Sequence, residues 1–457
     1  MNQRTISPSG QQRRRLLQSM LFSAGGAMLP PMLTGCGSEA TGPAATGGIV
    51  TPNNTTASAL ANTPLFSNIG PLRDPDANGV RTPAGFSTRV VAINNQPPVA
   101  GGSYNWHIFN DGGGVLALPD GGWIYCSNSE VPGFTSIGFQ EPRLARFTNQ
   151  LAFAPGLGGA SALRFARDGT VVDAYRILSN TTFNCAGVIT PWGTWLSCEE
   201  IPEGLVWECD PLGRNAAVAK PALGKFAHEA VAIDASRKVF YMTEDQPDGR
   251  FYRWVPTASD WPSGSPRARM ENGTLQVLKV GGLGLVGALT APQPITWVTA
   301  QNPSAGQNEN RIAGTGVFDG GEGIWYHNDF VFFTTKGDDT VWAVDTVRNT
   351  IEVLYRANPA LPARDFLTGV DNITVTPFGE ILIAEDGGDM QVVVMNRDRT
   401  LKPLLQIVGQ DQSEVAGIAF NPDFTRMYFT SDRGGPAPGG GYTNGLGMLY
   451  ELRLPPR

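Results

Sequence analysis

Acidic side chains recur at two positions of a repeated strand–turn–strand pattern, and they are the residues best suited to chemistry. The first strand of successive copies opens with a carboxylate or a thiol: Cys185, Glu229, Glu322, Asp371 and Glu414. The second strand ends in further acids: Glu130, Glu199, Glu200, Glu244, Glu385 and Asp386. Carboxylate oxygens suit hard cations such as Ca²⁺ or ferric iron, and a thiolate suits a transition metal. The pattern indicates a metal centre.

The recurrence matters because equivalent positions of a repeat can converge. In a β-propeller the first strand of each blade lines the central channel, so equivalent residues form a ring. Several carboxylates on one axis would repel and desolvate one another, and cations relieve both effects. Any one of these acids, taken alone, is more often a surface turn residue. The shared position within the repeat favours a site over that alternative.

Other chemistries find little support in the sequence. It has no Walker-type phosphate loop and no G-x-S-x-G nucleophile motif. With only three histidines, His107, His228 and His327, a zinc site built on imidazoles is not favoured. The Gly112–Gly114 run is expected to be a flexible turn. Three further cysteines, Cys126, Cys198 and Cys209, are either small buried residues or, for Cys198 and Cys209, a disulfide, and the sequence leaves both options open.

The elements that would position these acids are short strands. The clearest copy covers residues 370–386 and turns at Pro377-Phe378-Gly379. Five further copies cover residues 116–130, 185–200, 228–245, 322–335 and 414–432. The repetition predicts an all-β fold, a six-bladed β-propeller with inserted loops. A sandwich or a β-helix is the alternative, but a sandwich would not need the same polar residue at the start of every unit.

The N-terminal segment has the layout of an export signal. Arg13 and Arg14 precede an apolar stretch from Met20 to Met32, which is typical of twin-arginine export, and Cys36 lies where a bacterial lipobox would place the lipid-modified cysteine. A plain cleavage site is the alternative. We therefore divide the chain into a signal peptide (1–35), a low-complexity tether (36–62) and a single β-propeller domain (63–457). The expected destination is the periplasm or, as a lipoprotein, the outer membrane, with the extracellular space as a further option.

Charge and hydropathy exclude some partners. Without residues 1–35, which carry four Arg and no acid, the chain has 30 basic and 41 acidic side chains, and this balance argues against a nucleic-acid partner. No internal apolar stretch is long enough to span a bilayer. Membrane contact is expected only through an N-terminal lipid anchor.

Several motifs resemble the PhoX family of secreted alkaline phosphatases. Asn184-Cys185-Ala186-Gly187, Thr190-Pro191-Trp192-Gly193-Thr194-Trp195-Leu196 and Cys198-Glu199-Glu200 are similar to its signature block. Further family blocks follow in order: Phe226 to Ala230, Glu244-Asp245, Glu322-Gly323-Ile324, Asp371-Asn372-Ile373, Glu385-Asp386-Gly387 and Glu414 to Gly417. The resemblance covers residues 100 to 451.

The resemblance implies an exported, metal-dependent phosphomonoesterase that uses Fe³⁺ and Ca²⁺ at the mouth of a six-bladed propeller. It implies that Cys185, Glu229 and Glu322 are iron ligands. Further residues would complete iron or calcium coordination: Glu199, Glu200, Asp371, Glu385 and Glu414. The expected partner is a small phosphorylated substrate, and we expect a monomer.

Two departures from the family pattern concern the substrate. The family commonly has Asn-His-Glu where this chain has Asn128-Ser129-Glu130, and an Arg commonly stands where this chain has Gly320. Such an Arg would clamp a phosphate, so Lys336 or Arg311 are the candidates to replace it. No catalytic residue is assigned. A calcium-dependent lactonase or esterase, or a non-catalytic ligand-binding propeller, remains as an alternative function.

Overall fold

The computed structural model describes most of the chain beyond its N-terminal segment. The described residues are 64–131, 158–281, 289–358, 367–411, 413–437, 441–443 and 447–456. The predicted signal peptide and tether, with Cys36, lie outside them. Two short 3-10 segments, Pro221–Leu223 and Gln307–Glu309, are the helical elements of the described part. None of its helices has the length and hydropathy to cross a membrane.

Most strands belong to four- or five-stranded antiparallel sheets. One contains β3 (Asn110–Ala117), β4 (Trp123–Ser129), β5 (Gly158–Phe165) and β6 (Val171–Thr181). The next contains β7 (Asn184–Ile189), β8 (Trp195–Glu199), β9 (Val206–Cys209) and β10 (Val218–Ala219). A third contains β20 (Val370–Val375), β21 (Ile381–Glu385), β22 (Gln391–Met395), β23 (Leu401–Ile407) and β1 (Val80–Arg81). A fourth contains β24 (Val415–Phe420), β25 (Arg426–Ser431), β28 (Met448–Arg453) and β2 (Ser87–Ile93).

A nine-stranded sheet occupies the middle of the chain. It contains β11 (His228–Asp234), β12 (Val239–Glu244), β13 (Phe251–Pro256), β14 (Gly273–Val280), β15 (Gln293–Thr299), β19 (Thr350–Arg356), β18 (Thr340–Asp345), β17 (Phe330–Thr335) and β16 (Gly321–His327), in that order. The strand β15 joins its two halves, because it pairs with both β14 and β19. A separate two-stranded ribbon consists of β26 (Pro436–Ala437) and β27 (Gly441–Thr443).

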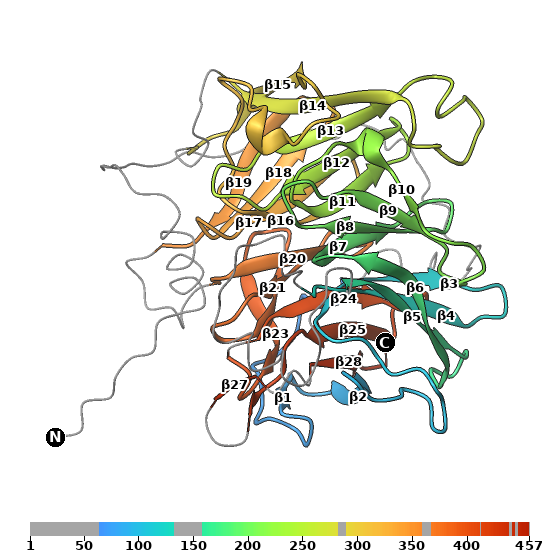
Figure 1. The fold of residues 1–457 in the computed structure, drawn as a ribbon. Helices are drawn as coiled ribbons and strands as arrows, with labels where there is room; N and C mark the ends of the chain where they lie inside the picture. The colour runs from blue at the N-terminus through green and yellow to red at the C-terminus, as the bar shows by residue number, and fades with distance from the viewer. Residues whose placement is uncertain are drawn as a thin grey trace.

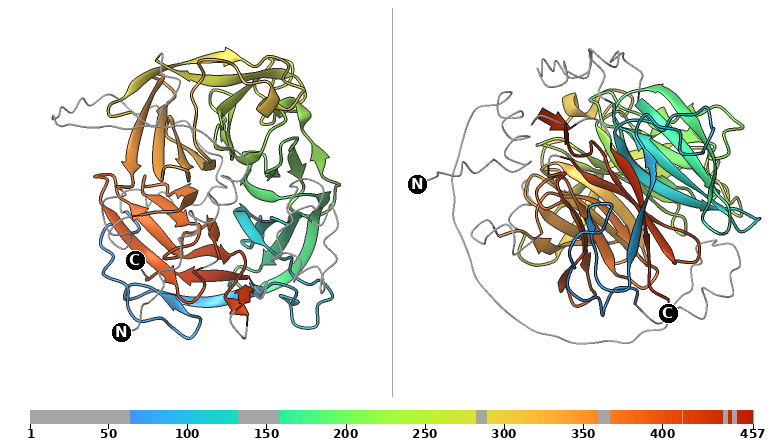
Figure 2. Two further views of the ribbon diagram at one scale, coloured as in Figure 1. Left: turned by 60° about the vertical axis from the view of Figure 1, so that its left-hand side comes forward. Right: turned by 90° about the horizontal axis from the view of Figure 1, so that it is seen from below.

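The sheets follow one another around a common axis (Figures 1 and 2). The first strands lie against one another in a closed ring among the described residues, in the order β3, β7, β11, β16, β20, β24 and back to β3. This arrangement confirms the all-β, propeller-like fold. It differs from six separate sheets because β15 merges the strands of the third and fourth repeats.

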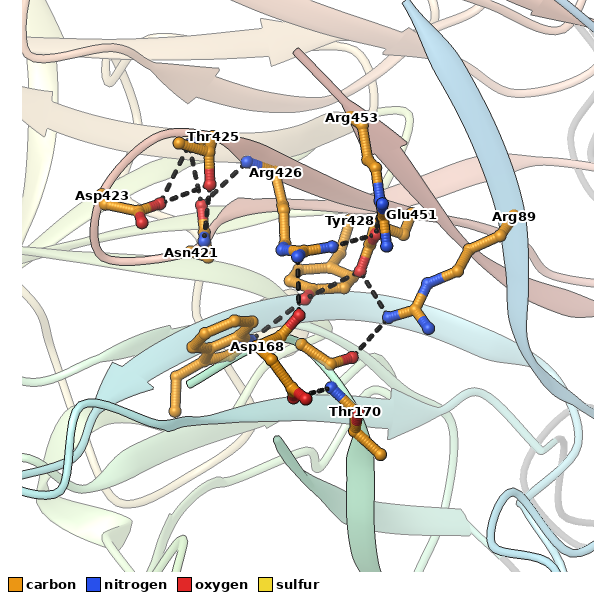
Figure 3. Close-up of polar contacts among 12 residues, drawn as sticks. Arg89, Asp168, Thr170, Asn421, Asp423, Thr425, Arg426, Tyr428, Glu451 and Arg453 are labelled. Carbon is orange, nitrogen blue, oxygen red and sulfur yellow. Dashed lines mark hydrogen bonds and ion pairs between the residues drawn. The ribbon is translucent and has the colours of Figure 1, made fainter. Parts of the chain in front are cut away.

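The ring closes by joining the two ends of the domain. The early strand β2 pairs with β28, which pairs with β25. Three arginines, Arg89 on β2, Arg426 on β25 and Arg453 on β28, converge on the buried carboxylate of Glu451 (Figure 3). Arg89 and Arg426 also donate to the carbonyls of Gly169 and Asp168 in the turn between β5 and β6. Arg89 and Arg426, both paired with Glu451, therefore tie the closing sheet to the neighbouring sheet.

The hydrophobic core lies between neighbouring sheets, so the strands that face it are apolar. Strands such as β21 (Ile-Leu-Ile-Ala-Glu) and β22 (Gln-Val-Val-Val-Met) are rich in β-branched residues and bury their side chains between neighbouring sheets. Four tryptophans are among the largest fully buried side chains: Trp106, Trp195, Trp254 and Trp342.

The Gly112–Gly114 run differs from the flexible turn expected from the sequence. These glycines form part of β3 and are not a flexible turn. A Cβ on Gly112 would lie 2.4 Å from the Cα of Ala186, and one on Gly113 would lie 2.1 Å from the hydroxyl of Tyr125. The run therefore allows β3 to pack closely against its neighbours.

Candidate metal centre

Two positions of the repeat place polar side chains at one end of the inner strands. The first position is the second residue of the inner strand, or in the last repeat the residue just before it: Asp111, Cys185, Glu229, Glu322, Asp371 and Glu414. The second position is the residue directly after the second strand: Glu130, Glu200, Asp245, Lys336, Asp386 and Asp432. We call these twelve residues the inner-end ring.

A register irregularity spans the first position in five of the six repeats, and in the last repeat it lies between Ala416 and Ala419, after Glu414. In β7 it falls between Asn184 and Gly187, and in β11 between His228 and Val231. Corresponding irregularities span the first position in β3, β16 and β20. A bulge inserts an extra residue and re-aims a side chain. In these five inner strands the bulge therefore interrupts the regular alternation of side chains at the ring residue.

Side chains of one repeat hold the backbone of the next repeat at the ring. Asn128 Nδ2 donates to the carbonyl of Cys185 at 2.8 Å. Thr334 Oγ1 donates to the carbonyl of Asp371 at 2.5 Å, and Thr243 Oγ1 donates to the carbonyl of Glu322. Because each bond crosses between repeats, the positions of the ring residues depend on how the repeats pack.

The ring brings ligand atoms of several repeats together. Five overlapping groups have donor atoms that all lie within 4.8 Å of one another: Asp111, Glu130 and Cys185; Cys185, Glu200 and Glu229; Glu130, Glu414 and Asp432; Glu229, Glu322 and Asp371; and Asp371, Asp386 and Glu414. Eight of these ten donor residues are buried, and Glu200 and Asp386 are half-buried. Each group combines residues from at least two repeats.

Burial and mutual repulsion act together on these acids. Burial raises the pKa of Glu229 well above its usual range, and the charges of Glu322 and Asp111 raise it further. The pKa of Asp111 is raised by burial and then by Glu130. Burial, followed by the charge of Glu200, raises the pKa of the Cys185 thiol. Burial and mutual repulsion therefore disfavour the ionised forms of these groups, and bound cations would favour them.

Two basic side chains, those of Lys336 and Arg433, form ion pairs with acids of the ring. Lys336 Nζ contacts Asp245 Oδ2 at 2.6 Å and also contacts Glu322. Arg433, directly after the ring residue Asp432, contacts Asp432 and has its Nη2 atom 2.6 Å from Glu414 Oε2. Burial alone would lower the pKa of Arg433, but the charges of these acids raise it. Both cations offset part of the charge of the ring.

Six of the eight predicted metal ligands lie in the donor groups: Cys185, Glu200, Glu229, Glu322, Asp371 and Glu414. Glu199 instead accepts hydrogen bonds from the amide of Leu205 and from Trp207 Nε1. Glu385 accepts from the amide of Gln391 at 3.0 Å. The structure places both acids outside the donor groups, because the last residue of the second strand turns toward the following loop.

The loop that follows the second strand also holds the guanidinium of Arg311. Glu244, the equivalent of Glu199 and Glu385, accepts from the amide of Arg250 and from the Nη1 atom of Arg311. Arg311 also donates through Nε and Nη2 to Asp248, and through Nη1 to Tyr252. Its guanidinium is therefore engaged in this loop, whereas the other phosphate candidate, Lys336, belongs to the ring.

Several residues of the centre are not predicted by the sequence pattern. Asp111, Asp432 and Arg433 are absent from the predicted site, and Glu130 and Asp386 are predicted only as strand ends. Asp111 is absent because the pattern places the start of the first repeat at Leu116, whereas β3 begins at Asn110. The available signal was the residue after each strand-terminal acid, as in Glu199-Glu200, Glu244-Asp245 and Glu385-Asp386.

The other cysteines and two histidines lie outside the donor groups. Cys126, Cys198 and Cys209 are buried free thiols, so Cys198 and Cys209 do not form a disulfide. His107 Nδ1 lies 2.7 Å from Ser161 Oγ, and His228 Nε2 lies 3.2 Å from the carbonyl of Gly224.

Comparison with known proteins identifies the family. A family model for the alkaline phosphatase PhoX matches residues 146–207 and 201–360. The chain belongs to the PhoX family. Pseudomonas fluorescens PhoX, solved in complex with vanadate, a transition-state analogue, has a similar fold: TM-score 0.64 at 16% identity, covering 84% of this chain and 97% of that chain.

Two further solved structures are more distant. A gluconolactonase from Xanthomonas campestris has a TM-score of 0.45 at 13% identity and covers 85% of this chain and 99% of its own. A protein of unknown function from Bacteroides thetaiotaomicron has a TM-score of 0.44 at 9% identity and covers 84% and 83%. No curated protein matches this chain.

Proposed function

We propose that this PhoX-family protein is a metal-dependent phosphomonoester hydrolase whose centre is the inner-end ring. The observation that carries the proposal is the set of overlapping donor groups formed by buried carboxylates and the Cys185 thiol. Membership of the alkaline phosphatase PhoX family supports the reaction class.

The donor set fits the cations that the family resemblance implies. Calcium takes six to eight oxygen ligands, and a thiolate is a ligand for iron-type metals. Asp111 Oδ1 and Asp432 Oδ1 are buried and accept no hydrogen bond from the described residues. A buried carboxylate oxygen without a donor is costly, and a cation would satisfy it. We propose Fe³⁺ near Cys185, Glu200 and Glu229, with Ca²⁺ held by carboxylates alone.

The protein's own residues would prepare the centre for an anionic substrate. When bound, the cations would polarise the phosphoryl oxygens and offset the charge on the transferring group. Asn128, Thr243 and Thr334 hold the backbone of ring residues, so little rearrangement is needed on binding. Lys336 is a candidate for a phosphate contact because it already lies within the ring.

Lys336 also lies next to Gly320, the position at which the family commonly has an arginine. Gly320 has φ +68°, and a Cβ there would lie 3.0 Å from Lys336 Cγ and 3.2 Å from Asp245 Oδ1. A side chain at position 320 would therefore enter space that Lys336 occupies. This proximity supports Lys336 as the local replacement for the family arginine.

Two finer features of the architecture and the location belong to the proposal. We interpret the nine-stranded sheet as two blades, β11–β14 and β16–β19, joined by β15, so that the six strands of the inner ring belong to six blades. We also propose export by the twin-arginine route with a lipid anchor at Cys36, on the sequence pattern of residues 1–36.

The test is elemental analysis of the natively exported protein, with hydrolysis of p-nitrophenyl phosphate measured on the same sample. We expect iron, calcium and turnover together. The variant Glu229→Gln should lose metal and turnover, because Glu229 belongs to two donor groups. Glu385→Gln is the matched control, since Glu385 is equally buried but accepts backbone hydrogen bonds outside the groups.

The outcomes separate the alternatives. Metal-free protein, or equal metal loss in both variants, would contradict the placement of the centre. Calcium without iron or phosphatase turnover would retain the carboxylate site and redirect the function to a lactonase, an esterase or a ligand-binding propeller.

A further inference from the structure

Arg433 differs from the other basic residues near the centre in how its guanidinium is used. A guanidinium carries five N–H donors. In Arg433, Nε contacts Asp432 and Nη2 contacts Glu414, while Nη1 makes no hydrogen bond with the described residues. The edge formed by Nη1 and the second Nη2 hydrogen is therefore available for a ligand.

The backbone of Arg433 is fixed in place. Its amide donates to Ser413 Oγ at 2.8 Å, and the amide of Gly434 donates to the same oxygen at 3.1 Å. Ser413 precedes the ring residue Glu414, and its hydroxyl also lies 2.9 Å from that of Ser431. Arg433 is thus held against the ring by both its backbone and its side chain, as a binding residue needs to be.

Arg433 also lies toward solvent relative to the acids that it contacts. Its side chain is 24% exposed, compared with 3% for Glu414 and 0% for Asp432. Asp386, whose Oδ1 atom lies 3.9 Å from Arg433 Nη2, is 13% exposed. A phosphorylated substrate that enters from this side would meet the guanidinium before the buried carboxylates.

The negative charge of the ring carboxylates makes a contact between the substrate and a basic side chain necessary. Carboxylates repel a phosphate dianion, so a substrate would need a cation that is not fully engaged by the ring. Arg311 uses Nε, Nη1 and Nη2 on Glu244, Asp248 and Tyr252. Lys336, the proposed local replacement for the family arginine, can add a point charge but lies between two carboxylates, is 10% exposed and does not supply a bidentate contact. Arginine binds phosphate through two parallel N–H···O bonds, which lysine cannot do.

We propose that Arg433 is a phosphoryl-binding residue of this protein, contacting the substrate through the Nη1–Nη2 edge of its guanidinium. The proposal rests on the phosphatase function proposed above, and it assigns a substrate contact to the sixth repeat. The ligand class is a phosphate monoester or inorganic phosphate, bound as an oxyanion.

The experiment measures the binding of inorganic phosphate to the metal-loaded full-length protein by calorimetry, and KM and kcat with p-nitrophenyl phosphate. Arg433→Gln should weaken phosphate binding and raise KM by roughly ten- to a hundredfold, the range expected for lost charge-assisted hydrogen bonds. Arg433→Lys should recover only part of this loss, because it restores the charge without the fork. Arg453→Gln, which removes an equal charge at Glu451 outside the ring, is the control and should leave phosphate binding unchanged.

Metal content is measured in each variant, because a purely electrostatic role predicts a different result. If Arg433 only offsets the charge of Glu414 and Asp432, its loss would change metal content, and Arg433→Lys would restore phosphate affinity fully; either result would overturn the proposal. Phosphate binding that depends on Arg433 without any turnover would sustain this inference and contradict the hydrolase function. Turnover with unchanged phosphate affinity in Arg433→Gln would sustain the hydrolase function and contradict the role of Arg433 in phosphate binding.

Discussion

Replacing Asn128 with alanine should destabilise the protein and disturb the metal centre together. The side chain of Asn128 is fully buried and makes four hydrogen bonds. Nδ2 donates to the carbonyls of Cys185 and Ala186 at 2.8 and 2.9 Å. Oδ1 accepts from Trp195 Nε1 at 2.9 Å and from Ser197 Oγ at 2.8 Å. The hydrogen-bonding capacity of the amide is therefore fully used.

The magnitude follows from the partners that the substitution would strand. Asn128→Ala removes the partner of two carbonyls, of an indole N–H and of the O–H of Ser197, whose oxygen still accepts from Asn184 Nδ2, in a region closed to water. A buried polar group without a partner costs about 1 kcal/mol at the lower end of the measured range, so four such groups cost about 4 kcal/mol. This loss is large beside the total stability of a typical domain, about 5–15 kcal/mol. The Cys185 carbonyl is one of the four, so we also expect a lower iron content.

The assay is chemical denaturation of the unsubstituted protein and of Asn128→Ala, with iron measured in each before unfolding. Asn215→Ala is the matched control, because Asn215 is exposed and donates only to Asp210 Oδ2; its effect should stay within about 0.5 kcal/mol. A loss below about 1 kcal/mol in Asn128→Ala, with unchanged iron, would refute the argument that this amide holds the ring.

Three further predictions concern the centre, the closing sheet and the glycine run. Cys185→Ala should lose iron and activity and keep its circular dichroism spectrum, whereas Cys198→Ala, also a buried free thiol, should keep its iron; equal iron in both variants would remove the thiol from the centre. Glu451→Gln should lower the unfolding free energy by about 3 kcal/mol at pH 7 because it leaves the arginines around it without a counter-charge. Burial alone would raise the pKa of Glu451, but the hydrogen bond and charge of Arg89, with further contributions from Arg453 and Arg426, lower it. The difference in unfolding free energy between Glu451→Gln and the unsubstituted protein should therefore be complete above about pH 4.3 and disappear as the pH falls through the lowered pKa of Glu451. Denaturation at several pH values measures it, and a pH-independent difference would contradict the charge argument. Gly113→Ala should cost roughly 1–3 kcal/mol in the same assay, since its Cβ would lie 2.1 Å from the Tyr125 hydroxyl, while Gly70→Ala, with no heavy atom within 4 Å, should be neutral.

The sequence by itself predicted the repeat, the all-β class and most of the inner-strand acids. These features are local, because alternating apolar residues, the Pro/Gly turns and the polar start of each unit all lie within about twenty residues. Cys185, Glu229 and Asp371 could be named for this reason, since each opens an inner strand.

Only the tertiary structure decided which second-strand acid turns inward. Glu199 and Glu200 are adjacent, as are Glu385 and Asp386, and nothing in composition distinguishes them. In the structure the first acid of each pair accepts amides of the following loop, and the second lies in the ring. Successive residues of an extended chain point in opposite directions, so one position of register determines the choice.

The packing between repeats decided the rest. β15 joins two repeats into one sheet through pairings with β14 and β19, and Arg433 reaches Glu414 because Ser413 holds its backbone. These contacts link residues that are distant in the chain or depend on a particular loop path. Pairing energies between strands are small and similar for many partners, so the partner is selected by the packing of the whole ring.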